Sequence, residues 1–286
     1  VNMDLKSEKI LIAGAGISGI GAAALLGKAG IAAAIYDGNE ELDKEAVAAK
    51  LPEGMEISFE LGEFKEELAD KYDMLILSPG ISIHKPVAKA FYDRKKPVWG
   101  EIELAYSFAK GRLIAITGTN GKTTTTALTG EIMKNYFKDV RVVGNIGIPY
   151  TSEAATMTDE TVTVAEISSF QLETIHEFHP QISAILNITP DHLNRHHTME
   201  CYIRTKEAIT TNQTNDEVCV LNYEDEVLRA FGESAPVHVV WFSSARKLAE
   251  GFYLDGEEIF YAHDGNTEKV INVNDLNLLG RHNYEN

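Results

Sequence analysis

Short apolar runs alternate with turns and helical segments along the first hundred residues of the chain. An apolar run over 9–13 enters a glycine-rich turn over 14–19, and a segment of helical composition follows over 20–29. A second apolar run over 32–36 ends at Asp37. The order of strand, glycine turn, helix, strand and acid predicts the opening of a doubly wound, Rossmann-like parallel sheet.

The glycine turn is of a type that binds nucleotide diphosphates. Glycines let the backbone approach a pyrophosphate closely, and the helix N-terminus adds amides and a partial positive charge. The candidate contacts in and after this turn are Gly16, Ile17, Ser18, Asp37 and Gly38. Two simpler interpretations stay open: a tight strand–helix connection, and a solvated acid at the end of a strand.

A third strand over 73–78 leads to further candidate contacts, Ser78, Pro79 and Gly80, at the end where ligands of parallel sheets bind. A Pro-Val-Trp-Gly stretch over 97–100 then ends this pattern, and 101–110 has helical composition. We therefore expect one domain over 1–98, which binds the nucleotide diphosphate, and a second over 99–286.

The second domain begins with an isoleucine-rich strand over 112–117, a turn over 118–122 and a helix from Thr123 onward. This is the setting of a phosphate-binding loop, although Ile116 stands where the standard pattern has glycine. Lys122 is placed to meet the β and γ phosphates, and the Thr123 hydroxyl to meet Mg²⁺. The predicted ATP-binding residues of this loop are Gly118, Thr119, Asn120, Gly121, Lys122, Thr123 and Thr124.

Composition narrows the classes of partner. A chain of 286 residues favours two domains, and a formal charge of −17 argues against nucleic acid and anionic membranes as partners. Two cysteines lack the spacing of a metal site or a disulfide framework, and no apolar run is long enough to span a membrane. We expect a cytoplasmic monomer, without membrane insertion, that binds small molecules.

Further motifs lie at predicted strand ends and on one helix. They cover 142–149, 162–173, 185–195, 202–206 and 280–286. Together with the loop Thr-Gly-Thr-Asn-Gly-Lys-Thr over 117–123, they resemble the Mur ligases, in which the unusual lead-in to the loop is expected. The run Glu-Ile-Ser-Ser-Phe-Gln-Leu-Glu over 166–173 is similar to the D-glutamate-adding branch, and the resemblance extends from Gly14 to Asn286.

This resemblance implies a reaction. It implies that D-glutamate is joined to UDP-N-acetylmuramoyl-L-alanine (UDP-MurNAc-L-Ala) through an acyl phosphate, with ATP and Mg²⁺, in peptidoglycan precursor synthesis. Such chemistry needs a hard cation held by oxygen ligands, and Glu166 at a strand end is a candidate.

The resemblance also implies roles for individual residues. It makes His192 a ligand of a second Mg²⁺, and Lys206 a carbamylated metal ligand. Lys122, Glu166, His192 and Lys206 thus form the predicted catalytic set. The UDP-linked substrate would contact Asn145, Ser168, Gln171 and His192, with Asn145 at its muramoyl part and Ser168 and Gln171 near the phosphates and metal. The ATP adenine would contact Asn283 and Asn286.

Simpler interpretations of these residues also exist. Asn145 is equally typical of a left-handed turn, Ser168 and Gln171 of helix caps, and Lys206 of a helix surface. His196 and His197 are expected in a solvated loop. Three other functions remain open: a sister ligase, a non-catalytic module that binds UDP-sugars, and a nicotinamide dehydrogenase.

The family has a third domain that binds the incoming amino acid. The sequence stops at Asn286, within the segment expected to contact adenine. We therefore expect these residues alone to bind nucleotides without completing the ligation.

Overall fold

The computed structural model describes residues 4–55, 57–276 and 281–285. The chain forms two compact units and returns twice to the first after entering the second. The first unit contains Val1–Gly111, Val143–Glu160 and Phe170–Phe178, and the second contains Arg112–Val142, Thr161–Ser169 and His179–Asn286.

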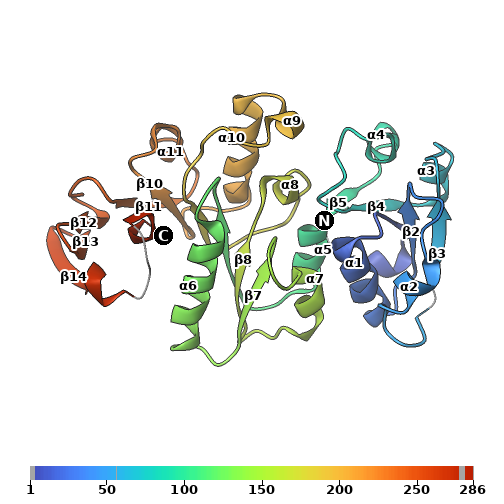
Figure 1. The fold of residues 1–286 in the computed structure, drawn as a ribbon, viewed down its shortest axis with the longest axis horizontal. Coiled ribbons are helices and arrows are strands. Elements are labelled where there is room, and N and C mark those ends of the chain that lie inside the picture. Colours follow the sequence, from blue (N-terminus) through green and yellow to red (C-terminus); the bar gives the residue numbers. More distant parts are fainter. Residues whose placement is uncertain (1–3, 56, 277–280, 286) are drawn as a thin grey trace. The chain divides into compact units, whose positions relative to one another are not determined.

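The first unit is built on a parallel sheet with the strand order β3-β2-β1-β4-β5 (Figure 1). Its strands are β1 (Ile10–Ala13), β2 (Ala33–Asp37), β3 (Ser58–Leu61), β4 (Met74–Leu77) and β5 (Val98–Gly100). All residues of β1 and β4 are buried, as expected for the centre of a parallel sheet that is covered on both faces.

The first unit also contains helices. They are α1 (Ile17–Lys28), α2 (Lys44–Ala48), α3 (Leu68–Lys71), α4 (Pro86–Asp93), α5 (Glu101–Phe108), α7 (Tyr150–Glu153) and α8 (Ser169–Leu172), with the short 3₁₀ helices η1 (Leu5–Ser7) and η2 (Ala154–Thr156). Leu11 of β1 and Leu75 of β4 pack in one cluster with Val87 and Phe91 of α4. Helix α1 packs against β1, β2 and β4, and also against α5 and α7.

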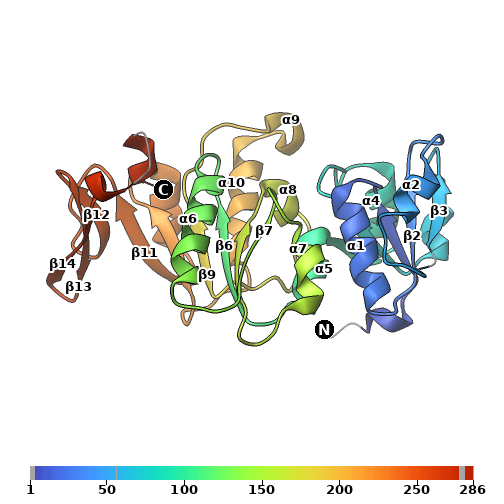
Figure 2. The same ribbon diagram turned by 60° about the horizontal axis from the view of Figure 1, so that its bottom comes forward.

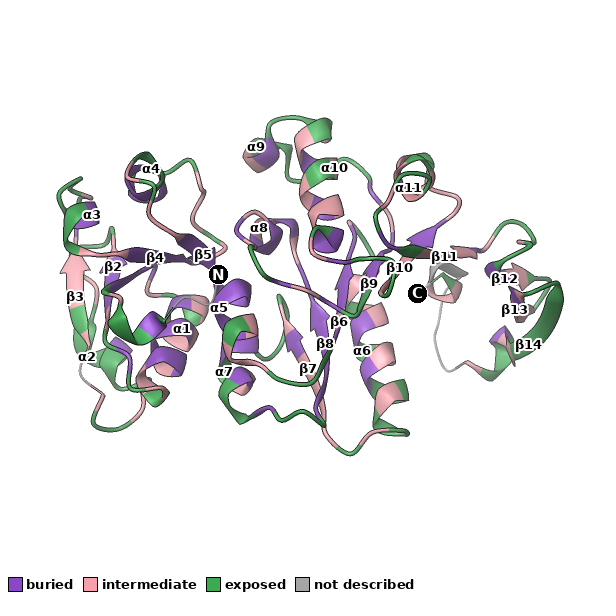
Figure 3. Ribbon diagram, turned by 180° about the vertical axis from the view of Figure 1, so that it is seen from behind, coloured by how far each residue is buried: buried purple, intermediate pink, exposed green. Residues whose placement is uncertain are grey.

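The second unit contains a mixed sheet with the order β14-β13-β12-β11-β10-β9-β6-β8-β7 (Figure 2). Its strands are β6 (Arg112–Thr117), β7 (Val140–Gly144), β8 (Val162–Glu166), β9 (Ile182–Ile185), β10 (Val218–Asn222), β11 (His238–Ser243), β12 (Gly251–Asp255), β13 (Glu258–His263) and β14 (Asn266–Asn272). Strands β12, β13 and β14 pair antiparallel, and β14 is largely exposed (Figure 3).

The helices of the second unit begin with α6, which packs against β6 and β8. They are α6 (Lys122–Lys134), α9 (Leu193–His196), α10 (Met199–Glu207) and α11 (Glu226–Gly232), with the 3₁₀ helices η3 (Ala208–Thr210), η4 (Val273–Asp275) and η5 (Arg281–Tyr284). Among the described residues, no helix is both long and apolar enough to cross a bilayer.

The strand orders contain two topological switch points. In the first unit β1 lies between β2 and β4, and in the second β6 lies between β8 and β9. The chain therefore leaves each of these strands beside neighbours whose connections run in opposite directions, which opens a crevice at the carboxyl end. The glycine turn follows β1 and the phosphate loop follows β6, so both predicted ligand loops occupy such a position.

The predicted fold class is confirmed, with two local differences. Helix α1 begins at Ile17 and not at residue 20. The stretch 216–240 has valines at alternating positions, which favour sheet, but it also contains α11, in which Val227 N and Leu228 N donate to the Asp225 side chain.

Candidate active site

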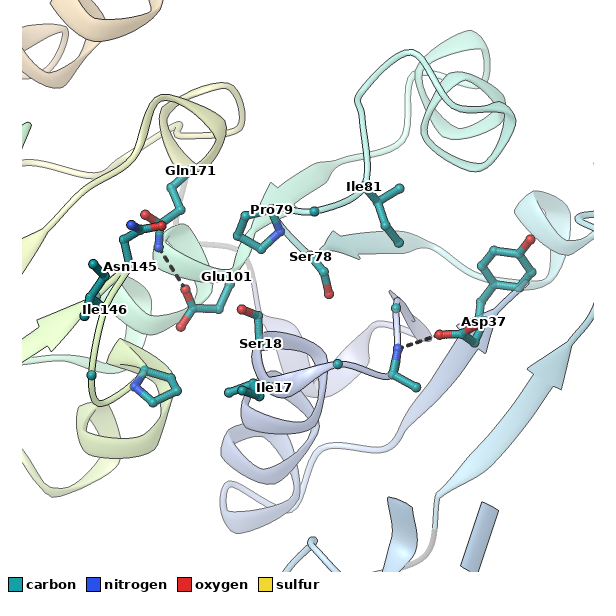
Figure 4. Close-up of a pocket in the computed structure, with 18 of the residues that line it drawn as sticks. Ile17, Ser18, Asp37, Ser78, Pro79, Ile81, Glu101, Asn145, Ile146 and Gln171 are labelled. Carbon is teal, nitrogen blue, oxygen red and sulfur yellow. Dashed lines mark hydrogen bonds between the residues drawn. The ribbon is translucent and has the colours of Figure 1, made fainter. Parts of the chain in front are cut away.

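A cavity of about 760 Å³ lies at the carboxyl ends of β1, β2 and β4 in the first unit (Figure 4). Most residues predicted to contact a nucleotide-linked substrate line it. They are Gly16, Ile17, Ser18, Asp37, Gly38, Ser78, Pro79, Gly80, Asn145 and Gln171. The structure thus brings together residues that are far apart in the sequence.

The glycines of the turn have separate structural reasons. Gly14 has φ of +97°, and a Cβ there would lie 2.9 Å from Ser78 Oγ. A Cβ on Gly19 would lie 1.8 Å from the carbonyl oxygen of Gly14, so only glycine fits where α1 approaches the turn. A Cβ on Gly16 would meet nothing within 4 Å. Gly16 therefore leaves space beside the cavity and is not required by packing.

Asp37, the last residue of β2, stabilises the glycine turn between β1 and α1. Its Oδ2 accepts a hydrogen bond from Ala15 N at 2.9 Å, and its Oδ1 accepts one from Asn39 N at 3.0 Å. The carboxylate thus fixes the backbone just before α1, where the first amides of the helix have no side-chain cap. This arrangement leaves the N-terminus of α1 available to an anionic ligand.

Glu101 lines the far side of the cavity and was not predicted as a site residue. It is 2% exposed, and its Oε1 accepts hydrogen bonds from Thr151 N at 3.2 Å and from Thr151 Oγ1 at 3.0 Å. Gln171 Nε2 donates to its Oε2 at 3.5 Å. Burial raises the pKa of Glu101, and these hydrogen bonds oppose that shift. An acid at the first position of a helix is favoured by the helix dipole, so its sequence position alone carried no signal of a site.

The phosphate loop of the second unit is held by the chain that follows β9. Thr119 N donates to Asn187 O at 2.9 Å, and Asn120 N donates to Asn187 Oδ1 at 2.8 Å. In return, Asn187 Nδ2 donates to Asn120 O at 3.1 Å. Gly121 has φ of +84° and caps α6, so the loop reverses direction directly into the helix N-terminus.

Two lysines meet at one carbonyl oxygen of the loop. Lys122 Nζ donates to Gly118 O at 2.9 Å and to Thr119 O at 2.8 Å. Lys206 Nζ, carried by α10, donates to the same Gly118 O at 2.7 Å and lies 3.4 Å from Thr117 Oγ1. Burial lowers the pKa of Lys122, while Glu166 and Asp191 act in the opposite direction.

Lys206 is 2% exposed, so the interpretation of this residue as a surface lysine is wrong. Burial lowers the pKa of Lys206 to about 7; the Lys122 charge adds to this shift and Asp191 opposes it. Tyr202, one turn earlier on α10, lies with its ring 4.9 Å from Lys206 Nζ and with its hydroxyl 3.1 Å from Thr119 Oγ1. Helix α10 thus delivers a buried amine to the phosphate loop.

Glu166 is the last residue of β8 and is 2% exposed beside the end of β6. His192 has a φ of +51°, an uncommon conformation for a residue other than glycine, and its Nε2 lies 3.5 Å from Asp191 Oδ2. Among the residues that the structure describes, no group of three or more His, Cys, Asp or Glu side chains is arranged to hold a metal ion. Any cation here would therefore need further oxygen ligands from a nucleotide or from water.

The remaining predicted residues are placed as follows. Ser168 and His192 do not line the cavity of the first unit, and both belong to the second unit. Asn283 lies in η5, and Asn286 lies outside the described residues. Asn145 is absent from the positive-φ residues of the described chain, so its interpretation as a left-handed turn residue is wrong.

His196 also differs from the sequence-based expectation. It is 2% exposed, and its Nε2 lies 2.9 Å from Ser169 Oγ, which links α9 to the start of α8. His197 is exposed, as expected. The burial of His196 depends on contacts with residues distant in sequence, and its Arg-His-His neighbourhood resembles an ordinary polar loop.

Two models of known protein domains match the chain. A profile of the Mur ligase middle domain matches residues 116–286, and one of the MurD-like N-terminal domain of Mur ligases matches residues 8–100. The chain belongs to the Mur ligase family. The Mur ligase relatives include UDP-N-acetylmuramoylalanine–D-glutamate ligases from Lachnospira eligens, 56% identical, and from Lachnoclostridium phytofermentans, 50% identical, each over 99% of this chain. The predicted resemblance to the D-glutamate-adding branch is confirmed by these relatives.

The chain spans 63% of the length of both curated Mur ligase relatives. A crystal structure of UDP-N-acetylmuramate:L-alanyl-gamma-D-glutamyl-meso-diaminopimelate ligase from Neisseria meningitides matches 97% of this chain and 90% of its own, with a TM-score of 0.61 and 17% identity. That likeness shows the Mur ligase fold alone.

Proposed function

We propose that the protein to which this chain belongs is an ATP-dependent ligase that adds D-glutamate to UDP-MurNAc-L-Ala in peptidoglycan precursor synthesis. The observation that carries the proposal is 56% identity, over 99% of the chain, to a relative named for that activity. The two ligand loops at switch points support it, because this reaction needs one site for a nucleotide-linked acceptor and another for ATP.

The cavity of the first unit is our proposed site for the UDP moiety. The uncapped N-terminus of α1 can receive the diphosphate, and the space beside Gly16 lets it approach the backbone. Asp37 lies at the end of β2, where a ribose or base would reach it. The Asp37 carboxylate already accepts hydrogen bonds from Ala15 N and Asn39 N, so we propose that its main role is to fix the conformation of the glycine turn.

The loop over 118–122 is our proposed site for the ATP phosphates. On ATP binding, Lys122 would exchange the carbonyls of Gly118 and Thr119 for the β and γ phosphate oxygens. Its positive charge then offsets the charge that develops as the acyl phosphate forms and is attacked by the amino group of D-glutamate. Helix α6 adds the amides of its first turn to the same task.

Mg²⁺ is the cation that the donor set fits. The Thr123 hydroxyl and the Glu166 carboxylate are hard oxygen donors, and the charges of Glu166 and Asp191 both act on Lys122. We propose that Glu166 and Thr123 hold one ion, and that His192 and carbamylated Lys206 hold a second. Bound Mg²⁺ would supply charge neutralisation at the phosphates.

We place the reaction in the cytoplasm, in line with two free cysteines. We propose that the enzyme acts as a monomer on its small-molecule substrates. The test uses the intact natural protein with ATP, Mg²⁺ and UDP-MurNAc-L-Ala, and it measures phosphate release and the mass of the nucleotide product. We expect turnover with D-glutamate and little with L-glutamate or L-alanine. A protein that prefers another amino acid is a sister ligase, and one that binds the nucleotide-sugar without phosphate release is a binding module.

A further inference from the structure

Two buried acids of α5 have different surroundings. Glu103 is 1% exposed, and its carboxylate accepts hydrogen bonds from the backbone amides of His176, Glu177 and Phe178 at 2.7 to 3.1 Å. These three hydrogen bonds explain why Glu103 is buried and give it a structural role. Glu101 is equally buried but lies in the wall of the cavity.

The two oxygens of Glu101 are also unlike each other. Oε1 accepts from both the backbone amide and the hydroxyl of Thr151, which fixes the start of α7. Within the described residues, Oε2 receives only the Gln171 amide, at the long distance of 3.5 Å. A buried carboxyl oxygen with one long hydrogen bond retains the capacity to accept another.

The position of Glu101 along the cavity suggests which part of a ligand reaches it. Figure 4 shows Asp37 at one end, Ser18 and the glycine turn in the middle, and Glu101 with Gln171 and Asn145 at the other end. A diphosphate at the N-terminus of α1 with its nucleoside toward Asp37 would direct whatever is attached to the second phosphate toward Glu101.

We propose that Glu101 is a specificity-determining residue of this cavity, whose Oε2 accepts a hydrogen bond from a neutral N–H or O–H group of the sugar or acyl part of a nucleotide-sugar ligand. The inference rests on the proposed function and extends it to a residue with no assigned role. A carboxylate here repels a second anion and attracts a neutral donor, so it selects hydroxyl and amide groups beyond the diphosphate.

The test compares Glu101→Gln with Glu103→Gln in the intact protein, using calorimetry with UDP and with UDP-MurNAc-L-Ala. In Glu101→Gln, the carboxamide oxygen retains the contacts to Thr151, while Nε2 replaces the accepting Oε2 by a donor. We expect unchanged affinity for UDP and affinity for UDP-MurNAc-L-Ala reduced about tenfold or more, which corresponds to one lost hydrogen bond to a charged group. Glu103→Gln should lower the melting temperature without a selective change between the two ligands.

Other outcomes overturn the inference. Equal losses for UDP and UDP-MurNAc-L-Ala in Glu101→Gln would make Glu101 a purely structural residue. Wild-type affinity for both ligands would mean that Oε2 meets no donor, or that it carries a proton and donates as glutamine does. If the wild-type protein binds neither ligand, the proposed function itself fails. If Glu101→Gln does not fold, Glu101→Asp takes its place, because it keeps the charge and withdraws the acceptor, and the same selective loss is expected.

Discussion

At the scale of single residues, the shared carbonyl of Gly118 is the central feature of the phosphate loop. Lys122 and Lys206 both donate to it, so two amines from different helices meet at one carbonyl of the loop that we propose binds the ATP phosphates. Burial lowers the pKa of both amines, and the nearby Lys122 charge lowers the pKa of Lys206 further.

We expect Lys122→Ala to abolish most ATP turnover without unfolding the protein. The loop retains its hydrogen bonds to Asn187, and Gly118 O retains Lys206. Loss of a charge that acts on the reacting phosphates should lower the rate by a factor on the order of 10² or more. Phosphate release with UDP-MurNAc-L-Ala and D-glutamate measures this, with Lys134→Ala, an exposed lysine at the far end of α6, as the control. Near-wild-type release by a folded Lys122→Ala protein would contradict the assignment of the loop.

Lys206 is expected to carry a carbamate when CO₂ is available. The neutral amine attacks the carbon of CO₂, an N–C bond forms and a proton leaves, which converts a cation into an anionic oxygen ligand. A pKa of about 7 leaves much of the amine neutral near pH 7. Lys206→Ala should be nearly inactive, and acetate should restore part of the rate by standing in for the carbamate. A carbamate signal in ¹³C NMR of wild-type protein with labelled bicarbonate gives independent evidence. Full activity of Lys206→Ala would show that the amine has no such role.

Lys206 should also leave a mark on stability as the pH changes. Its pKa is about 7 when folded and about 10.4 in an unfolded chain, so between these values the unfolded state binds more protons. Stability therefore rises with pH across this window, by at most about 1.4 kcal/mol per pH unit from this group. Urea unfolding of wild type and Lys206→Met in CO₂-free buffers measures the contribution. Identical slopes for the two proteins would contradict the lowered pKa.

The strand–loop–helix setting of Lys122 and Thr123 could be predicted from the sequence, but the burial of Lys206, His196 and Glu101 could not. Lys122 and Thr123 follow from the local order of strand, loop and helix. Lys206 is buried where its amine reaches the turn after β6, and there it donates to Gly118 O, 88 positions away in the sequence. His196 and Glu101 are buried by similar non-local contacts.

At the scale of elements, the turn between β1 and α1 shows how two glycines of one motif can serve different ends. Gly19 is required by the carbonyl of Gly14, whereas Gly16 faces open space. The first is a packing requirement of the folded chain, and the second leaves open space beside the cavity that we propose receives a diphosphate.

Gly19→Ala and Gly16→Ala should therefore separate stability from binding. Gly19→Ala forces a methyl group into the Gly14 carbonyl and should destabilise the fold by about 1–3 kcal/mol. Gly16→Ala, whose extended backbone suits alanine, should melt like wild type but bind UDP more weakly, by about tenfold. Denaturant unfolding and calorimetry measure the two effects. If both variants bind UDP as wild type does, the cavity does not receive the diphosphate at this turn.

Elements with strong local patterns matched their predictions, and elements that depend on distant support did not. The strand over 112–117 was predicted with the bounds it has, because isoleucines and a following glycine mark it. The two hydrogen bonds between Asn187 and Asn120 were not predicted, because no local sequence pattern indicates that the Asn187 side chain contacts the phosphate loop.

At the scale of the whole molecule, ligand selectivity distinguishes the proposed function from a dehydrogenase. UDP should raise the melting temperature and NAD should not. A ligand at 100 times its dissociation constant stabilises the folded state by about 2.7 kcal/mol, enough for a clear shift. Thermal unfolding with each nucleotide at matched concentrations provides the measurement. Protection by NAD alone would favour the dehydrogenase interpretation.

The assignment of segments to the two units does not follow their order in the sequence. Two units were expected in succession, whereas Val143–Glu160 and Phe170–Phe178 return to the first unit. These segments supply Asn145, Pro149 and Gln171 to the cavity, and no composition change at their borders marks the return.

In a nascent chain, the glycine turn therefore leaves the ribosome long before Asn145, Pro149 and Gln171, which form one wall of the cavity. The sheet from β1 to β5 is available once Gly100 has emerged, but Thr151 and Gln171 follow Glu101 by 50 and 70 residues, at the usual translation rate of about 5–20 residues per second. For several seconds Glu101 therefore lacks these two hydrogen-bond partners, and the order of synthesis delays the completion of the proposed nucleotide-sugar site until the phosphate loop, too, has been made.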